Sequence, residues 1–133
     1  MIAVDTSVIA AIAFNEPERE LFISRILASE RALISAATLV EVRIVIRSRS
    51  NEQGAYFVEE FLKLPSFEIV AVDGSIADIA SQAYVAFGKG SGHPAQLNYG
   101  DVFSYALAKA KSIPLLFKGD DFSHTDVLIC GWQ

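Results

Sequence analysis

Acidic residues recur at the ends of short apolar runs, where a chemically active site could form. They are Asp5, Glu41, Asp101 and the neighbouring pair Asp120 and Asp121. Carboxylates that gather at one place repel one another, and a bound cation offsets that repulsion. Because the two His and the single Cys show no metal-ligand spacing, the oxygen ligands favour Mg²⁺, or alternatively Mn²⁺. Such ions activate water in phosphate chemistry, so the pattern predicts a metal-dependent enzyme acting on phosphate esters.

Glu41 is the most informative of these acids. Its neighbours one helical turn away are Ala37 and Thr38 on one side and Ile44 and Val45 on the other, so we expect it near-buried on an apolar stripe. A buried carboxylate without a partner is costly or becomes neutral. No Lys or Arg lies three or four positions away. The partner must come from elsewhere, either as a divalent cation shared with other acids or as a distant Arg or Ser.

The other acids also have purely structural interpretations. Asp5 could cap the first helix, and Asp101 could be a first-turn acid favoured by the helix dipole. Asp120 and Asp121 could be ordinary loop acids. The functional interpretation therefore depends on the fold bringing these acids together.

Other kinds of catalytic site find little support in the sequence. Ser7 and Ser104 have no neighbouring His to act as a base, so each is expected to orient an acid or cap a helix. The glycine-rich run at 88–92 follows a predicted helix rather than a strand, which makes it a weak phosphate cradle. Cys130 is expected to be packed rather than nucleophilic.

Strand-like and helix-like segments alternate along the chain and determine where the acids would lie. Apolar runs predict strands, and capped or amphipathic segments predict helices. Strands are expected at 2–4, 32–34, 67–72, 114–117 and 127–129, and helices are expected to end near residues 12, 28, 47, 64, 87 and 111. This alternation is typical of a parallel sheet covered by helices on both faces. Sites in such sheets form beyond the carboxyl ends of the strands, which is where the acids stand.

The composition fits one ordered domain over residues 1–133. Apolar residues make up 52% of the chain and charged residues 20%, which argues against disorder. No apolar run reaches the ~18 residues needed to span a bilayer. The first residues form no basic leader, and the single Cys130 cannot form an internal disulfide. We therefore expect a cytoplasmic protein with no membrane association.

The net charge of −5 is unexpected for a protein that binds nucleic acid, because phosphates favour basic surfaces. Eleven Lys and Arg residues are still enough for one local basic patch. Arg43, Arg47 and Arg49 lie close together, and Lys89 and Lys118 stand in polar loops. The excess of acids fits carboxylates gathered around a cation.

Several motifs together resemble one known family over nearly the whole length of the chain. They are Val4-Asp5-Thr6-Ser7 and the runs at 34–41, 93–101, 103–108 and 115–126. With these motifs the chain resembles the PIN-domain ribonucleases, specifically the VapC-type toxins of toxin–antitoxin pairs. The resemblance implies a three-layer α/β/α fold with a central parallel sheet of about five strands.

The resemblance also implies an activity and a site. The activity is Mg²⁺-dependent cleavage of RNA, either transfer RNA or another structured RNA. Asp5, Glu41, Asp101 and one acid after the fourth strand would form the site, with Asp5 and Asp101 as metal ligands. Thr6 or Ser7 would hold a site carboxylate or a water by its hydroxyl. A VapB-type antitoxin would block the site with an Arg, which can replace a cation among carboxylates, and the toxin would form a homodimer.

The sequence departs from many relatives after the fourth strand, where a Thr-x-Asp pattern is common. Here the residues are Lys118-Gly119-Asp120-Asp121, so the fourth acid is either Asp120 or Asp121. In an extended segment only one of two neighbours faces the site. Relatives with Lys-Gly-Asn-Asp-Phe at this place keep only the second of the two acids. Phe122 is expected to pack on the core. We therefore favour Asp121, with Asp120 in a supporting place.

Two other functions are compatible with an acidic pocket on a parallel sheet. A receiver-like regulatory domain would accept a phosphoryl group on an acid, but such domains usually carry two adjacent acids after the first strand. Only Asp5 stands there. A PIN module that binds RNA or protein without cleaving it is the other alternative, and retention of all the acids argues against it.

Overall fold

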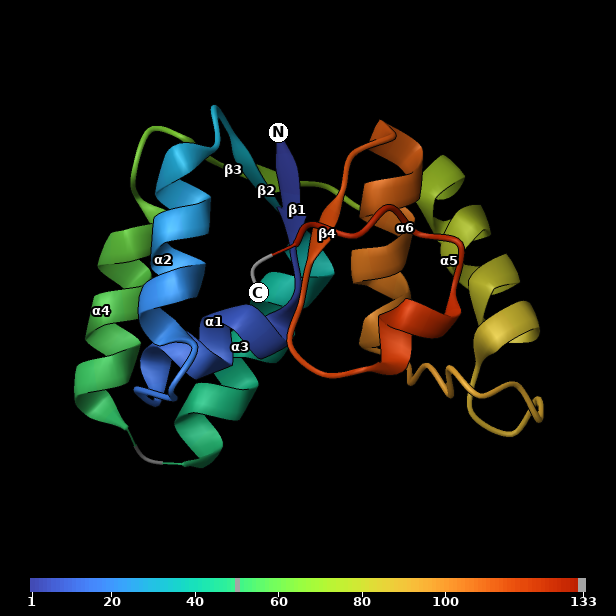
Figure 1. The fold of residues 1–133 in the computed structure, drawn as a ribbon, viewed down its shortest axis with the longest axis horizontal. Helices are drawn as coiled ribbons and strands as arrows, with labels where there is room; N and C mark the ends of the chain where they lie inside the picture. The colour runs from blue at the N-terminus through green and yellow to red at the C-terminus, as the bar shows by residue number, and fades with distance from the viewer. Residues whose placement is uncertain (50, 132–133) are drawn as a thin grey trace.

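A four-stranded parallel β-sheet forms the centre of the molecule in a computed structural model, which describes residues 1–49 and 51–131 (Figure 1). Its strands are β1 (Ile2–Val4), β2 (Ala32–Ser35), β3 (Phe67–Val70) and β4 (Leu115–Leu116). The strand order is β3-β2-β1-β4, and every pair is parallel. Because the chain runs from β1 to β2 and β3 on one side but places β4 on the other, the order reverses at β1. A crevice for ligands forms at such a point, beyond the carboxyl ends of the strands.

Helices cover both faces of the sheet. They are α1 (Thr6–Ala13), α2 (Arg19–Ala28), α3 (Ala36–Ser48), α4 (Glu52–Leu62), α5 (Gly74–Phe87) and α6 (Asp101–Lys111). In Figure 1, α1 to α4 lie on one side of the sheet, and α5 and α6 lie on the other. The predicted three-layer α/β/α fold is therefore confirmed.

The alternation of side chains along β1 divides the core into two parts. Ile2 and Val4 point to the core under α1 to α4, while Ala3 points to the core under α5 and α6. All three residues are buried, which is why this strand reads as a continuous apolar run rather than an alternating one. The strand is thus fixed from both faces, and the residue that follows it is held in place.

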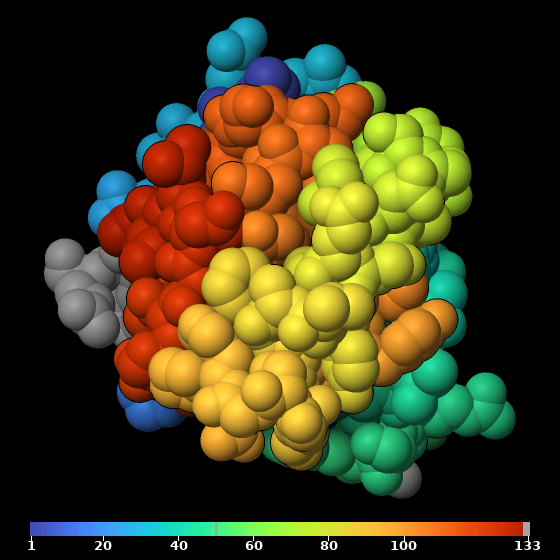
Figure 2. All heavy atoms as spheres, turned by 90° about the vertical axis from the view of Figure 1, so that its right-hand side faces the viewer, coloured from blue at the N-terminus to red at the C-terminus, as the bar shows by residue number. Residues whose placement is uncertain are grey.

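The C-terminal segment lies along β4 and across α6. Leu115 and Ile129 form a single parallel bridge, so the predicted fifth strand at 127–129 is reduced to one pairing. Asp126 accepts hydrogen bonds from the Tyr105 hydroxyl and, at 3.1 Å, from the Lys109 ammonium of α6. Figure 2 shows α5, α6, the loop after α5 and the C-terminal segment side by side on one face. No helix in the described part of the chain is long and apolar enough to cross a membrane.

Candidate active site

Asp5 lies at the centre of the site, directly after β1. Its backbone N–H donates to the Leu116 carbonyl of β4, so the residue continues the pairing of the two strands and lies beyond the carboxyl end of β1. Its carboxylate caps α1 by accepting from the Ser7 N–H at 3.0 Å, and it also accepts from the Ser7 hydroxyl at 2.7 Å and the Ser104 hydroxyl at 2.6 Å. Asp5 is only 4% exposed. Asp5 therefore caps α1 and also lies among the residues of the candidate site.

A buried chain of hydroxyls connects Asp5 to two further helices. Ser104 of α6 lies 3.3 Å from the Thr38 hydroxyl of α3, and both side chains are buried. Because the single hydroxyl proton of Ser104 is donated to Asp5, Thr38 must donate to Ser104. The expectation that Ser104 orients an acid is confirmed. The contribution of Thr38 was not foreseen, although a hydroxyl on the same apolar stripe as Glu41 was a usable signal.

Glu41 approaches the site from α3. It is half-buried rather than near-buried, because the stripe that carries it turns outward and leaves Ile44 63% exposed. The Thr6 hydroxyl donates to Oε1 of Glu41, so the distant partner is a threonine at the start of α1. Among the described residues, no Lys, Arg or His forms an ion pair with this carboxylate. A hydrogen bond thus fixes the position of the Glu41 carboxylate, and no described cation offsets its charge.

Asp101 opens α6 and faces the other acids. Its backbone N–H donates to the Asn98 side chain at 2.9 Å, and its carboxylate accepts from the Asn98 N–H at 3.0 Å, a reciprocal pair of the capping-box kind. Burial raises the pKa of Asp101 to about 7 against the opposing effect of the Asn98 hydrogen bond. The negative charges of Asp5, Asp121 and Glu41 raise this pKa further. These three acids therefore lie close enough to Asp101 to act on its carboxyl group.

The acid pair after β4 lies at a 3-10 turn, η1 (Asp121–His124), and not on the extended segment that was expected. Phe122 is 3% exposed and packs on the core as predicted. Asp120 lies 3.1 Å from the His124 ring and does not contribute to the raised pKa of Asp101. Asp121 does contribute, which places it on the side of the other acids. The assignment of Asp121 rather than Asp120 to the site stays a prediction.

The donor set suits a hydrated divalent cation better than a closed metal cage. Within the described residues, no three His, Cys, Asp or Glu side chains are grouped so that they could hold an ion by themselves. Mg²⁺ usually takes one or two carboxylates and completes its shell with waters and substrate phosphates. Asp5 and Asp101 supply two carboxylates with free oxygen lone pairs beside the crevice. The negative charges of Asp5, Asp121 and Glu41 around Asp101 are the part of this environment that a cation would offset.

The lysine nearest the site is engaged by acids outside it. The backbone N–H of Lys118 donates to the Ser7 hydroxyl at 2.9 Å, directly behind Asp5. Its ammonium lies 2.8 Å from Glu16 and 3.2 Å from Glu18, both before α2. The ammonium is thereby paired with acids that are not among the predicted site residues. Glu16 and Glu18 were not recognised from the sequence, because their pairing with a residue about a hundred positions away leaves no local pattern.

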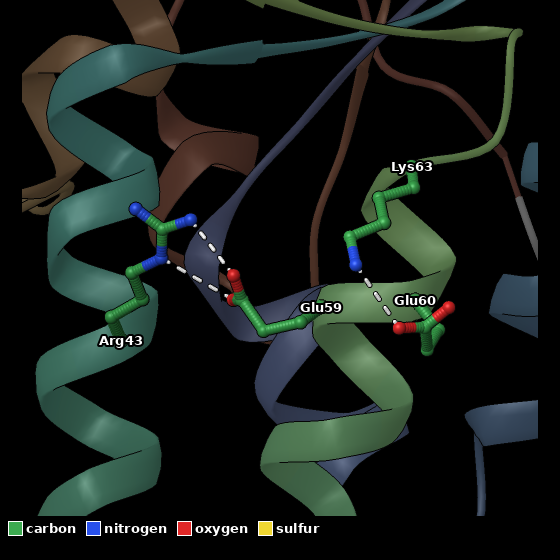
Figure 3. Close-up of polar contacts among 4 residues, drawn as sticks. All are labelled: Arg43, Glu59, Glu60 and Lys63. Carbon is green, nitrogen blue, oxygen red and sulfur yellow. Dashed lines mark hydrogen bonds and ion pairs between the residues drawn. The ribbon is translucent and has the colours of Figure 1, made fainter.

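The predicted arginine patch is largely occupied by contacts within the chain. Arg43 of α3 forms two hydrogen bonds with Glu59 of α4, at 2.8 and 3.3 Å (Figure 3). Arg49 stacks on the Phe14 ring, 4.3 Å from its centroid. A hollow between these helices contains none of the predicted site residues; it is lined by Arg43, Ile46, Arg47, Asn51, Glu52, Ala55 and Glu59. The acid site is instead an open edge of the sheet.

Comparison with known proteins identifies the family. A family model of the PIN domain matches residues 2–128. The chain belongs to the PIN-domain family. A VapC ribonuclease of Mycobacterium bovis is 43% identical over 126 residues, covering 95% of both chains. A ribonuclease VapC of Mycolicibacterium smegmatis is 45% identical over 126 residues, covering 95% of this chain and 97% of its own length.

Solved PIN-domain structures share the fold at much lower sequence identity. Mycobacterium tuberculosis VapC20, described as a Sarcin-Ricin loop cleaving toxin, has a TM-score of 0.77 at 19% identity and covers 98% of both chains. VapBC2 of Rickettsia felis, bound to a DNA fragment, has a TM-score of 0.79 at 16% identity and covers 100% of both chains. Membership in the PIN family rejects the receiver-like alternative. A PIN module that binds without cleaving is the alternative that an activity measurement must address.

Proposed function

We propose that this chain is the toxin of a toxin–antitoxin pair and acts as a Mg²⁺-dependent endoribonuclease, with Mn²⁺ as the alternative ion. The observation that carries the proposal is the gathering of acids around Asp101: burial first, and then the charges of Asp5, Asp121 and Glu41, raise its pKa to about 7. No basic side chain of the described residues pairs with any of the four. The names of the 43–45% identical relatives support RNA as the substrate.

In this proposal Asp5 and Asp101 hold the cation. The chemistry supplied by such an ion is activation of water and stabilisation of the charge that develops on the phosphate. Hydroxyls of Ser7 and Ser104 fix the Asp5 carboxylate before substrate binds, so no reorganisation is needed during the reaction. The Thr6 hydroxyl holds Glu41 beside this pair, where its carboxylate can orient or deprotonate a water.

The remaining site acids and the partners follow the same chemistry. Asp121 lies on the exposed rim, where it would complete the acid set, and Asp120 supports the turn through His124. The acids also suit the Arg of a VapB-type antitoxin, since a guanidinium can take the place of the cation. The solved relatives include a VapBC complex, which supports an antitoxin partner. We further propose transfer RNA or another structured RNA as substrate, a homodimer, and a cytoplasmic location.

The test is cleavage of total RNA by the purified protein, with the ends of the products mapped by sequencing. Asp5→Asn and Asp101→Asn are each expected to lower the cleavage rate about 1000-fold, because an amide holds Mg²⁺ far less well than a carboxylate. Asp78→Asn, which changes an exposed acid of α5, is the matched control and should cleave like the unmodified chain. A folded unmodified chain that cleaves no RNA with either ion would instead support the non-cleaving PIN module.

A further inference from the structure

The carboxylate of Glu41 occupies the space directly above the backbone of Gly100. A Cβ atom added to Gly100 would lie 2.0 Å from Oε2, 2.5 Å from Cδ and 2.7 Å from Oε1 of Glu41. All three distances are far shorter than any real contact between such atoms. The two residues are 59 positions apart in the sequence and come from α3 and from the start of α6, respectively, so the contact is made only by the fold.

The backbone conformation of Gly100 does not itself require glycine. Its φ of −67° and ψ of −39° are ordinary helical values that any residue adopts. Gly74, at the start of α5, offers a direct comparison, because an added Cβ there meets nothing within 4 Å. Glycine at position 100 is therefore needed for space and not for conformation, and the space is filled by a functional carboxylate.

We propose that Gly100 is a positioning residue: because it has no side chain, it allows the carboxylate of Glu41 to lie beside Asp101. The Thr6 hydroxyl holds Oε1 of Glu41 from the start of α1, and the bare Cα of Gly100 admits the carboxylate from the opposite helix. Glu41 is thus held between two helix starts by one hydrogen bond and one close approach. This inference rests on the proposed function for its effect on RNA cleavage, but its geometry can be tested without RNA.

The effect of a methyl group at Gly100 is expected to separate stability from activity. The atoms it would meet form the end of a flexible side chain, so Glu41 can swing aside and the backbone need not move. Replacing glycine by alanine at ordinary helical angles usually stabilises a fold, because the unfolded chain loses freedom. Gly100→Ala should therefore leave the melting temperature nearly unchanged while displacing the Glu41 carboxylate, because the loss of the Thr6–Glu41 hydrogen bond offsets that gain.

RNA cleavage tests the consequence for the site. Gly100→Ala is expected to lower kcat about 100-fold, as displacements of about 1 Å do, while Gly74→Ala cleaves like the unmodified chain. Glu41→Asp withdraws the carboxylate by one methylene, so on that background Gly100→Ala should lower kcat less than about threefold. Equal losses on both backgrounds, or a fully active Gly100→Ala variant, would overturn the inference.

Thermal unfolding tests the geometry independently of any activity. Thr6→Val removes the hydrogen bond to Glu41 and should lower the melting temperature by about 4 °C. If Gly100→Ala has already displaced Glu41, Thr6→Val should lower it by less than about 1 °C further. On the Gly74→Ala background the full decrease should remain. An equal decrease on the Gly100→Ala and Gly74→Ala backgrounds would overturn the inference. If Thr6→Val loses its effect on the Gly100→Ala background but the unmodified chain cleaves no RNA, that result would count against the proposed function alone.

Discussion

Carboxylates are treated in opposite ways in two regions of this molecule. In one region, Glu59 of α4 lies 2.8 Å from Arg43 of α3, and Glu60 lies 3.1 Å from Lys63 at the end of α4 (Figure 3). At the edge of the sheet, Asp5 and Glu41 are held by hydroxyls and a backbone N–H, and none of the described cations pairs with them. In the first region, Arg and Lys side chains offset the negative charge of the acids. In the second region, hydrogen bonds fix the positions of the carboxylates, and no described cation offsets their charge.

The contrast explains how a fold can build a cation site from neutral parts. A hydroxyl or an N–H donor orients a carboxylate without neutralising it, so the full charge stays available to an ion or an arginine from outside. A lysine at the same place would orient the acid and also compete with that ion. Lys118 is kept from this role by Glu16 and Glu18.

The largest effect concerns the acid pair after β4. Asp121 contributes to the negative field at Asp101, whereas Asp120 is engaged with His124. We expect Asp121→Asn to lower RNA cleavage about 100-fold and Asp120→Asn to lower it less than about threefold, measured at both saturating and limiting Mg²⁺. A larger loss for Asp120→Asn at both concentrations would reverse the assignment and place the paired acid in the site.

A smaller effect concerns stability and pH. The folded protein holds a proton on Asp101 up to a pKa of about 7, far above the ordinary value of 3.8. Between these values the folded state binds more protons than the unfolded state, so the stability of the metal-free protein should fall as pH rises from about 4 to 7 and then level off. Asp101→Asn removes this decrease and should melt about 5 °C higher than the unmodified chain near pH 8.

The measurement is a series of thermal melts in a chelator, with Asp78→Asn as a control that keeps the decrease. The advantage of Asp101→Asn should vanish towards pH 4, where the unmodified carboxyl is protonated in both the folded and the unfolded state. Added Mg²⁺ should then stabilise the unmodified chain near pH 8 more than the Asp101→Asn variant. Parallel curves for the two proteins would mean that the pKa of Asp101 is not raised in the folded protein.

The smallest effect is expected where the charges cancel. Arg43 is 55% exposed and Glu59 is 41% exposed, and pairs of this kind add little to stability because water screens them. Arg43→Ala and Glu59→Ala should each shift the melting temperature by less than about 3 °C and leave RNA cleavage unchanged. A strong loss of cleavage in either variant would show that this region takes part in the activity, and the contrast between the two regions would fail.

Much of the fold follows from local patterns in the sequence. Ile2-Ala3-Val4 is buried on both faces and therefore reads as a strand, and Asp5, Ser35 and Asn98 mark helix starts by their capping side chains. The segment at 127–129 was less predictable, because its apolar residues pair with β4 at one point only. Extended apolar residues do not reveal how many ladder hydrogen bonds they will form.

The site was predictable in its residue types but not in its contacts. Asp5 could be placed because a site forms beyond the carboxyl ends of parallel strands. Asp101 follows no strand; it opens α6, and the packing of α6 on the sheet brings it near Asp5. The burial of Glu41 was overestimated, because a helical stripe gives no sign of where the neighbouring helix ends. Thr38 and Gly100 act through residues far away in the sequence, and such pairs leave no periodic signal.

The long sequence separation of the contacts around Asp5 has a consequence for synthesis. Asp5 and Ser104 are 99 positions apart, and Ser7 and Lys118 are 111 apart. A growing chain that has not yet emerged beyond α5 has Asp5 without Ser104 and has no Asp101 at all. In terms of the proposed function, a chain synthesised only through α5 cannot assemble its site, so synthesis must pass Ser104 before the toxin can cut any RNA.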